Sequence, residues 1–143
     1  MEIVEIKNYS PENLKAVQKF AGILLSEEYM LTEEFFKQIL DSDNSHLFFI
    51  LEGENIAGML TVGTYKSPIG AKAWIEDVVI DDMYRGKGYG KSIVEYAIDY
   101  VRNSGIDFLM LTSNPTRIAA NKLYQDLGFE RKETNVYKMS FKK

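Results

Sequence analysis

A strand, a glycine-rich turn and a helix follow one another over 74–93, and this order constrains the fold most. The β-branched and aromatic residues of 74–80 are typical of a buried strand, which two aspartates end. The turn over 85–91 reads RGKGYGK, and an amphipathic helix is predicted from about Ser92 to Arg102. Glycines let a backbone approach an anion closely, and the free N–H groups of a helix's first turn can bind it. The segment therefore predicts a site for a phosphate-bearing ligand, with positive charge from Arg85, Lys87 and Lys91.

The turn differs from two common phosphate-binding loops. Residues 90–92 match the end of the Walker A pattern G-x-x-x-x-G-K-[ST], but its first glycine would fall at Arg85. The dinucleotide pattern G-x-G-x-x-G fails because its third glycine would fall at Lys91. The string does match R-G-x-G-x-G at a strand-to-helix junction, which resembles the coenzyme A pyrophosphate loop of the GNAT superfamily of N-acetyltransferases. The alternative is a glycine-rich surface turn flanked by solvated lysines.

A second pattern, near the end of the sequence, carries the same resemblance. The run ANKLYQDLGF over 120–129 is similar to the family signature A-x-x-[LF]-Y-x-x-x-G-F, with its tyrosine at Tyr124. The two signatures occur in the family's order and at its usual separation, so the resemblance covers essentially the whole chain. Many relatives have an asparagine seven residues before the tyrosine, where this chain has Arg117. Asn114 and Asn121 are the substitutes available to hold the pantetheine arm.

Composition and patterning favour one α/β domain over residues 1–143. Hydrophobic residues make up 45% of the chain, enough for a sizeable core, and no repeat or linker interrupts it. The strand, helix and strand over 74–111 form a crossover unit whose two strands should be parallel neighbours. The resemblance implies the GNAT fold, with a mixed sheet of about six to seven strands, about four helices and a splayed parallel pair at the cofactor site. Residues 64–72 are predicted to form a loop, and the alternating tail over 136–141 a final strand.

Composition also limits the partners. The chain has no cysteine, which excludes disulfides, thiolate metal sites and an acyl-cysteine intermediate, and with one histidine no metal site is expected. The formal charge of −4 argues against nucleic acid and mildly favours cationic substrates. No apolar run is long enough to span a bilayer, so a soluble, cytoplasmic protein without a membrane partner is predicted. His46 is expected to be a surface residue at a strand end, and a homodimer stays open.

The resemblance implies the cofactor and its contacts. Acetyl-CoA is the implied acetyl donor. The backbone of the strand Val78, Val79 and Ile80 is implied to pair with the pantetheine, and an N–H of Val78 or Val79 to bond the thioester oxygen. Tyr124 resembles the family's general acid, and a core tyrosine at an inward helical position is the alternative. The implied pyrophosphate contacts are Arg85, Gly86, Lys87, Gly88, Tyr89, Gly90 and Lys91.

Two carboxylates in the key strand are candidates for the general base. Glu76 and Asp77 are adjacent, so regular strand geometry places them on opposite faces. Charged groups inside an apolar strand are costly unless they are paired or used. Glu76 is the preferred base because it should share its face with Val78 and Ile80, and Asp77 comes second. A base acting through water is an equal alternative.

The sequence thus predicts an acetyl-CoA-dependent N-acetyltransferase that transfers directly to an amine in a ternary complex. A small primary amine is the leading acceptor, and protein or peptide amines are the second. A non-catalytic acyl-CoA-binding module is a third reading, but it would need neither Tyr124 nor two strand carboxylates. A nucleotide triphosphatase is disfavoured by Arg85 at the first Walker A position.

Overall fold

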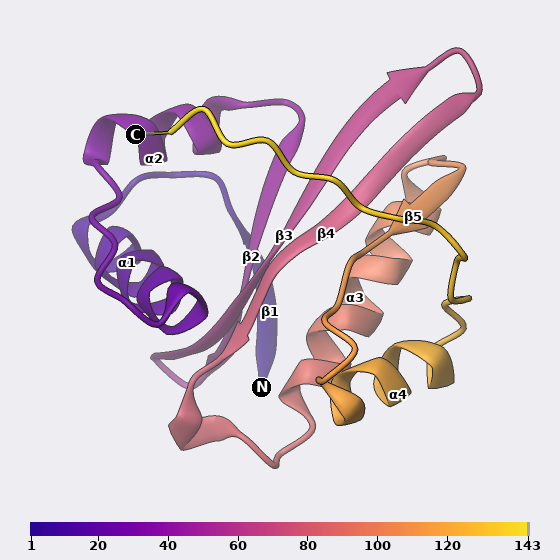
Figure 1. The fold of residues 1–143 in the computed structure, drawn as a ribbon. Coiled ribbons are helices and arrows are strands. Elements are labelled where there is room, and N and C mark those ends of the chain that lie inside the picture. Colours follow the sequence, from indigo (N-terminus) through magenta and orange to yellow (C-terminus); the bar gives the residue numbers. More distant parts are fainter. Residues whose placement is uncertain (143) are drawn as a thin grey trace. The chain divides into compact units, whose positions relative to one another are not determined.

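The structure, a computed structural model, describes residues 1–142 and divides into two compact units (Figure 1). Unit 1 comprises residues 1–112, and unit 2 begins at Ser113. The strands, all in unit 1, are β1 (Glu2–Ile6), β2 (Ser45–Glu52), β3 (Asn55–Ser67), β4 (Gly70–Ile80) and β5 (Phe108–Met110). The helices of unit 1 are α1 (Pro11–Leu25), α2 (Glu33–Asp41), the short 3-10 helix η1 (Asp82–Tyr84) and α3 (Tyr89–Asn103). Unit 2 contains α4 (Ile118–Asp126).

The strands of unit 1 form one mixed sheet with helices on both faces (Figure 1). Strands β1 to β4 are antiparallel neighbours in sequence order, and β5 lies parallel to β4. Phe48 and Phe49 are consecutive in β2 and therefore point to opposite faces. Phe49 belongs to a core cluster with Phe20 of α1 and Phe36 of α2, while the Phe48 ring contacts Tyr96 and Tyr100 of α3. The α1 and α2 helices thus cover one face, and α3 covers the other.

Local sequence accounts for the helix ends of unit 1. Ser10 precedes Pro11 at the start of α1, and its hydroxyl oxygen accepts a hydrogen bond from the Asn13 N–H at 3.1 Å. The Thr32 hydroxyl does the same for the N–H of Phe35 in α2, also at 3.1 Å. Among the helices of residues 1–142, none is long and apolar enough to cross a membrane.

The predicted crossover is confirmed, because β4 and β5 are parallel and α3 connects them. Other expectations are wrong. Residues 64–72 are not a loop, because β3 and β4 continue as a ladder until Ser67 pairs with Gly70. The tail over 136–141 is not a strand, because a strand needs a neighbouring backbone, and no ladder of the described residues includes it. The sheet accordingly has five strands and not six or seven. The helix after the turn also begins earlier than predicted, at Tyr89.

A β-bulge interrupts β4 at Asp77. Met59 of β3 pairs with Val79, but Thr61 pairs with Glu76, so Asp77 and Val78 together face the single residue between Met59 and Thr61. Paired residues point to the same face of a sheet, and Met59 and Thr61 are two residues apart. Glu76 therefore shares its face with Val79. The expectation that it shares a face with Val78 and Ile80 is wrong, since the extra residue reverses the alternation.

The bulge places Asp77 in the left-handed region, with φ at 55°. Aspartate tolerates this conformation better than a β-branched residue does. We expect Asp77→Val to lower the free energy of unfolding by about 1–2 kcal/mol, whereas Asp77→Gly, which has no such strain, should lower it less. Urea denaturation of both variants checks this. Equal stabilities of the Val and Gly variants would contradict a left-handed residue at this position.

Candidate active site

The glycine-rich turn leads into an uncapped helix N-terminus. Gly86 and Gly88 have φ values of 80° and 81°, a region that favours glycine, and a Cβ at either position would meet no atom within 4 Å. Gly88 is the N-cap of α3 and supplies no side-chain acceptor, in contrast to the caps of α1 and α2. The first turn of α3 contains no acidic residue. Its N–H groups and the positive end of the helix dipole are therefore suited to an anion.

Every cationic side chain of the turn is paired with an acid. Arg85 lies 3.0 Å from Asp82, and its Nε donates to the carbonyl oxygen of Ile80 at 3.4 Å. The Lys91 ammonium lies 3.7 Å from Glu95. Lys87 reaches Glu52 at 3.3 Å. These pairs are solvent-exposed and so individually weak, which leaves the cations able to exchange a carboxylate for a phosphate.

Glu52, at the end of β2, contacts this turn from another part of the sequence. The Tyr89 hydroxyl donates to its Oε1 at 2.6 Å, and the Tyr89 ring stacks on Tyr84 at 6.3 Å between centroids. The Tyr89 hydrogen bond, followed by that of Lys87, lowers the pKa of Glu52 below its usual value. The sequence pattern did not reveal this role, since Glu52 lies 37 residues before Tyr89.

Asp81 anchors the start of the turn. It is buried, with 6% of its surface exposed, and its Oδ1 accepts a hydrogen bond from the Met83 N–H of η1 at 3.1 Å. Its other carboxylate oxygen pairs with Lys19 of α1. The hydrogen bond from Lys19, and then the one from the Met83 N–H, lower the pKa of Asp81. Lys19 lies 62 residues before Asp81 and carries no sequence signal for this pairing.

The end of β4 is free on its β5 side. The parallel ladder contains only three residue pairs and ends where Trp74 pairs with Met110, whereas β4 continues to Ile80. The expected separation of the two strands is thus present in unit 1. Past Trp74, the backbone groups of β4 that point toward β5 have no ladder partner there. They are suited to hydrogen bonds with an extended ligand.

Glu76 and Asp77 lie on this free part of β4, and both are exposed to solvent. Within residues 1–142, neither carboxylate makes an ion pair or a hydrogen bond. Desolvation by the surrounding protein raises the pKa of both carboxyls, and the charge of Asp77 raises that of Glu76 further. A carboxylate with a raised pKa and access to water is a better base than a fully solvated one.

His46 is not the free surface residue that the sequence suggested. Its Nδ1 lies 3.0 Å from a carboxylate oxygen of Glu5 and 3.0 Å from the Tyr100 hydroxyl, and its side chain is 18% exposed. His46 and Glu52 lie six positions apart in the extended strand β2, a distance of about 20 Å. His46 therefore belongs to a polar cluster between β1, β2 and α3, away from the glycine-rich turn.

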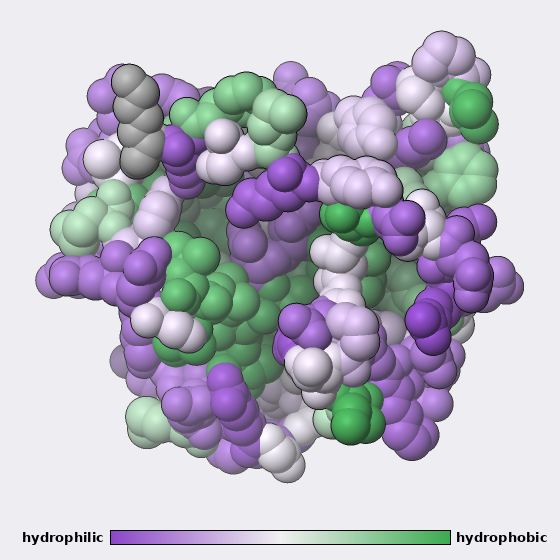
Figure 2. All heavy atoms as spheres, viewed as in Figure 1, coloured by the Kyte–Doolittle hydropathy of each residue, from purple (hydrophilic) through white to green (hydrophobic). Residues whose placement is uncertain are grey.

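The segment between α1 and α2 borders a pocket of about 280 Å³. Figure 2 shows apolar residues exposed in a hollow beside α1. Met30 and Phe35 are exposed by 68% and 52%, and Tyr29 packs at the margin of the core. The pocket is lined by Gln18, Lys19, Gly22, Glu28, Tyr29 and Met30.

Unit 2 contains the remaining predicted site residues. Tyr124 is buried, with 8% exposed, and its ring meets that of Phe129 edge to face at 6.0 Å. The Asn121 side chain donates to the carbonyl oxygens of Asn114 and Arg117 at 2.9 Å, and the Asn114 side chain accepts from Thr116. Both asparagines thus hold the approach to α4.

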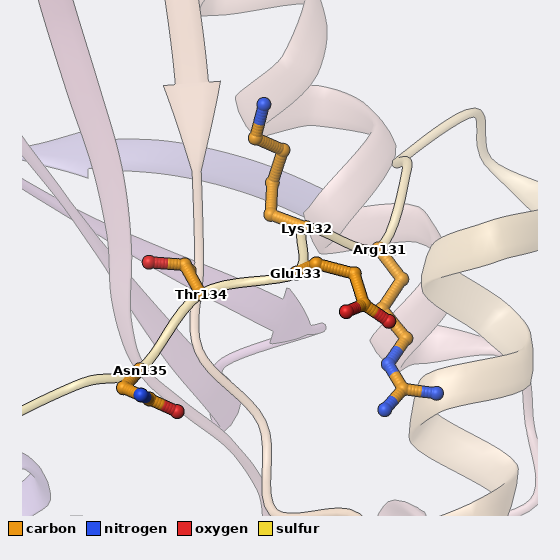
Figure 3. Close-up of a pocket in the computed structure, with 5 residues that line it drawn as sticks. All are labelled: Arg131, Lys132, Glu133, Thr134 and Asn135. Carbon is orange, nitrogen blue, oxygen red and sulfur yellow. The ribbon is translucent and has the colours of Figure 1, made fainter.

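Another pocket, of about 330 Å³, lies in unit 2 and is lined by residues 131–135 (Figure 3). The side chains of Arg131 and Lys132 point away from each other, so their charges do not converge on one ligand (Figure 3). In the described chain, no group of three or more acidic, histidine or cysteine residues is arranged to hold a metal ion.

Comparison with known proteins identifies the family that this chain matches. The acetyltransferase (GNAT) family profile matches residues 14–129. An uncharacterised N-acetyltransferase, YycN of Bacillus subtilis, is 30% identical over 91% of this chain and 83% of its own length. Glucosamine 6-phosphate N-acetyltransferase of Arabidopsis thaliana is 28% identical over 82% of this chain and 78% of its own. N-alpha-acetyltransferase 30 of Saccharomyces cerevisiae is 28% identical over 92% and 78%.

Among solved structures, a putative acetyltransferase from Agrobacterium tumefaciens superposes with a TM-score of 0.86. The superposition covers 98% of this chain and 100% of the Agrobacterium chain, and the two sequences are 20% identical. At that identity the likeness establishes the fold.

The raised pKa of Glu76 has a measurable consequence for stability. The folded protein holds the Glu76 proton more tightly than the unfolded chain does, so ionisation costs stability as the pH rises from about 4, the unfolded pKa, through the folded pKa. We expect Glu76→Gln to raise the melting temperature at pH 7 and to lose this advantage below about pH 4. Glu54→Gln, in an exposed turn, is the control and should show no such trend. A Glu76→Gln variant less stable than the parent at pH 7 would contradict the assignment.

Proposed function

We propose that this chain, which belongs to the acetyltransferase (GNAT) family, transfers an acetyl group from acetyl-CoA to the amine of a small molecule. The observation that carries the proposal is the uncapped N-terminus of α3, which follows two left-handed glycines at the end of a strand whose outer edge is free. The family match runs through both units, so we also propose that they form one catalytic domain.

The residues of the turn fit the pyrophosphate of coenzyme A. Open space at the Cβ positions of Gly86 and Gly88 allows close approach, and the N–H groups of the first α3 turn are the donors. Arg85, Lys87 and Lys91 supply the charge by exchanging their carboxylate partners. The free edge of β4 over 78–80 suits the pantetheine amides, and Asn114 and Asn121 are proposed to bind the same arm. Acetyl-CoA, when bound, supplies the acetyl group as a reactive thioester.

The proposed chemistry divides two proton transfers between two side chains. Glu76, directly or through a water, accepts the proton that the attacking amine loses as the new N–C bond forms. The raised pKa and the lack of a partner support this role, and Asp77 beside it is the second candidate. A backbone N–H of Val78 or Val79 stabilises the negative oxygen. As the C–S bond breaks, the Tyr124 hydroxyl gives its proton to the sulfur, so the transfer needs no covalent enzyme intermediate.

The acceptor class rests on charge and size. Two unpaired carboxylates on β4 favour a cationic amine, as does the net charge of −4. The pocket beside α1 has about 280 Å³, near the lower end of the range for small-molecule sites, and its lining contains both Glu28 and Lys19, which pairs with Asp81. By their names, the relatives include a glucosamine 6-phosphate N-acetyltransferase and an N-alpha-acetyltransferase. A protein or peptide acceptor is therefore the second candidate, and an acyl-CoA-binding module without turnover the third.

The cofactor proposal is tested by ligand-dependent melting. CoA should raise the melting temperature with increasing concentration, and equal concentrations of ATP should do much less. Gly88→Val should abolish the CoA effect, because the side chain occupies the space beside the turn and opposes the left-handed backbone. Gly105→Val is the matched control, since its φ is 71°, its Cβ position is equally open, and α3 separates it from the turn by about 22 Å. Equal shifts of the melting temperature with CoA and ATP, or CoA binding by the Gly88→Val variant, would contradict the cofactor proposal.

The general-acid proposal is tested at Tyr124. Tyr124→Phe removes only the hydroxyl and retains the ring contact with Phe129. We expect turnover, measured as thiol release with an amine acceptor found by library screening, to fall by about ten- to ten-thousand-fold. The dissociation constant for CoA should stay nearly constant, and the alkaline limb of the pH profile should weaken or move. Unchanged turnover would leave Tyr124 as a packing residue.

A further inference from the structure

We propose that Glu52 is a positioning residue that fixes the cofactor turn before any ligand arrives. The inference rests on the proposed function for its meaning, but the contacts that carry it are present in the protein alone. Glu52 is the last residue of β2. One of its partners, Lys87, belongs to the turn, and the other, Tyr89, is the first residue of α3. A strand on one side of the glycine-rich turn thereby holds the helix start on the other.

Four side chains make this connection, and together we call them the Glu52 cluster: Glu52, Tyr84, Lys87 and Tyr89. The Tyr89 hydroxyl donates to Glu52 at 2.6 Å, and the Lys87 ammonium lies 3.3 Å from the same carboxylate oxygen. Lys87 also lies over the Tyr84 ring at 5.4 Å, and that ring stacks on Tyr89. The cluster is therefore closed, since each member contacts two others.

The two contacts of Glu52 differ in strength. A hydroxyl donating to a carboxylate at 2.6 Å is a charge-assisted hydrogen bond of the stronger kind. The ion pair with Lys87 has both side chains more than a third exposed and contributes little by itself. Tyr89 is therefore the main attachment, while Lys87 is held loosely enough to turn toward a phosphate.

The contacts of Glu52 lie where the backbone of the turn is least restricted. Lys87 and Tyr89 flank Gly88, and Gly86 lies one residue further back, so the backbone between them has few intrinsic limits on its dihedral angles. Ordering such a segment upon binding costs conformational entropy, which a turn already held in place does not lose again. A carboxylate beside an anion site also repels the anion. We expect the gain from a turn already held in place to exceed this repulsion, so that Glu52 favours CoA binding overall.

Three variants and one control test the inference. Glu52→Ala should raise the dissociation constant for CoA and the KM for acetyl-CoA by about ten-fold, with kcat at saturation nearly unchanged. Tyr89→Phe should have a similar effect, and the double variant should be little worse than the weaker-binding single variant, because both remove one interaction. Glu54→Ala, two residues away in the turn that follows β2, should bind CoA like the parent. Tighter CoA binding by Glu52→Ala, or additive losses in the double variant, would overturn the inference.

Hydrogen exchange separates this inference from the proposed function. The Ser92 N–H donates to the Gly88 carbonyl oxygen at 3.1 Å, so its exchange reports the first turn of α3. Without ligand, Glu52→Ala should speed exchange over 92–95 and leave 99–103, at the far end of the helix, unchanged. If the parent protein binds no CoA, the proposed function fails while this measurement still decides the role of Glu52. Unchanged exchange over 92–95 would contradict the positioning role.

Discussion

Asp81 joins three parts of the fold through its backbone N–H and its carboxylate, at the point where β4 ends. Its N–H donates to the Ala57 carbonyl of β3 at 2.8 Å, one of its oxygens caps η1, and the other pairs with Lys19 of α1. Such a buried acid is stable only because each of these bonds is made. The pKa of Asp81 is lowered, so its contribution to stability is present above the unfolded pKa and disappears as the pH falls through the folded one. The direction in which the chain leaves the sheet depends on this residue.

Asp81 and Glu52 hold the glycine-rich turn from its two sides. Asp81 fixes the 3-10 helix that precedes the turn, and Glu52 holds Tyr89, which follows it. Only the short stretch over 85–88 lies between these anchors, and it contains both left-handed glycines. The backbone is thus free to take an unusual conformation while its ends are fixed. That combination presents helix N–H groups to an anion without closing the site with side chains.

The sequence predicted what depends on neighbouring residues. The strand–turn–helix order and the parallel crossover follow from local pattern and chemistry, and the structure contains both. The partners of Asp81 and Tyr89 lie 62 and 37 residues away, and no local pattern indicates such pairs. The long β3–β4 hairpin was missed because Pro68 in its turn and Gly70 directly after the turn are also typical of a loop. The roles of Tyr124, Glu76 and the turn residues in binding and catalysis stay predictions.

The bulge at Asp77 affects the site most. One extra residue in β4 reverses the face of the sheet to which Glu76 and the residues before it point. Its cost is local: a non-glycine residue with positive φ, and two adjacent carboxylates without a cation. Neither feature stabilises the fold, since a regular apolar strand would avoid both the strain and the repulsion. The bulge does move Glu76 to the face that α1 and α2 cover. A cationic amine at this face would supply the positive charge that the two carboxylates lack. Under the proposed function, an acceptor amine bound here would offset the repulsion between the two carboxylates of β4.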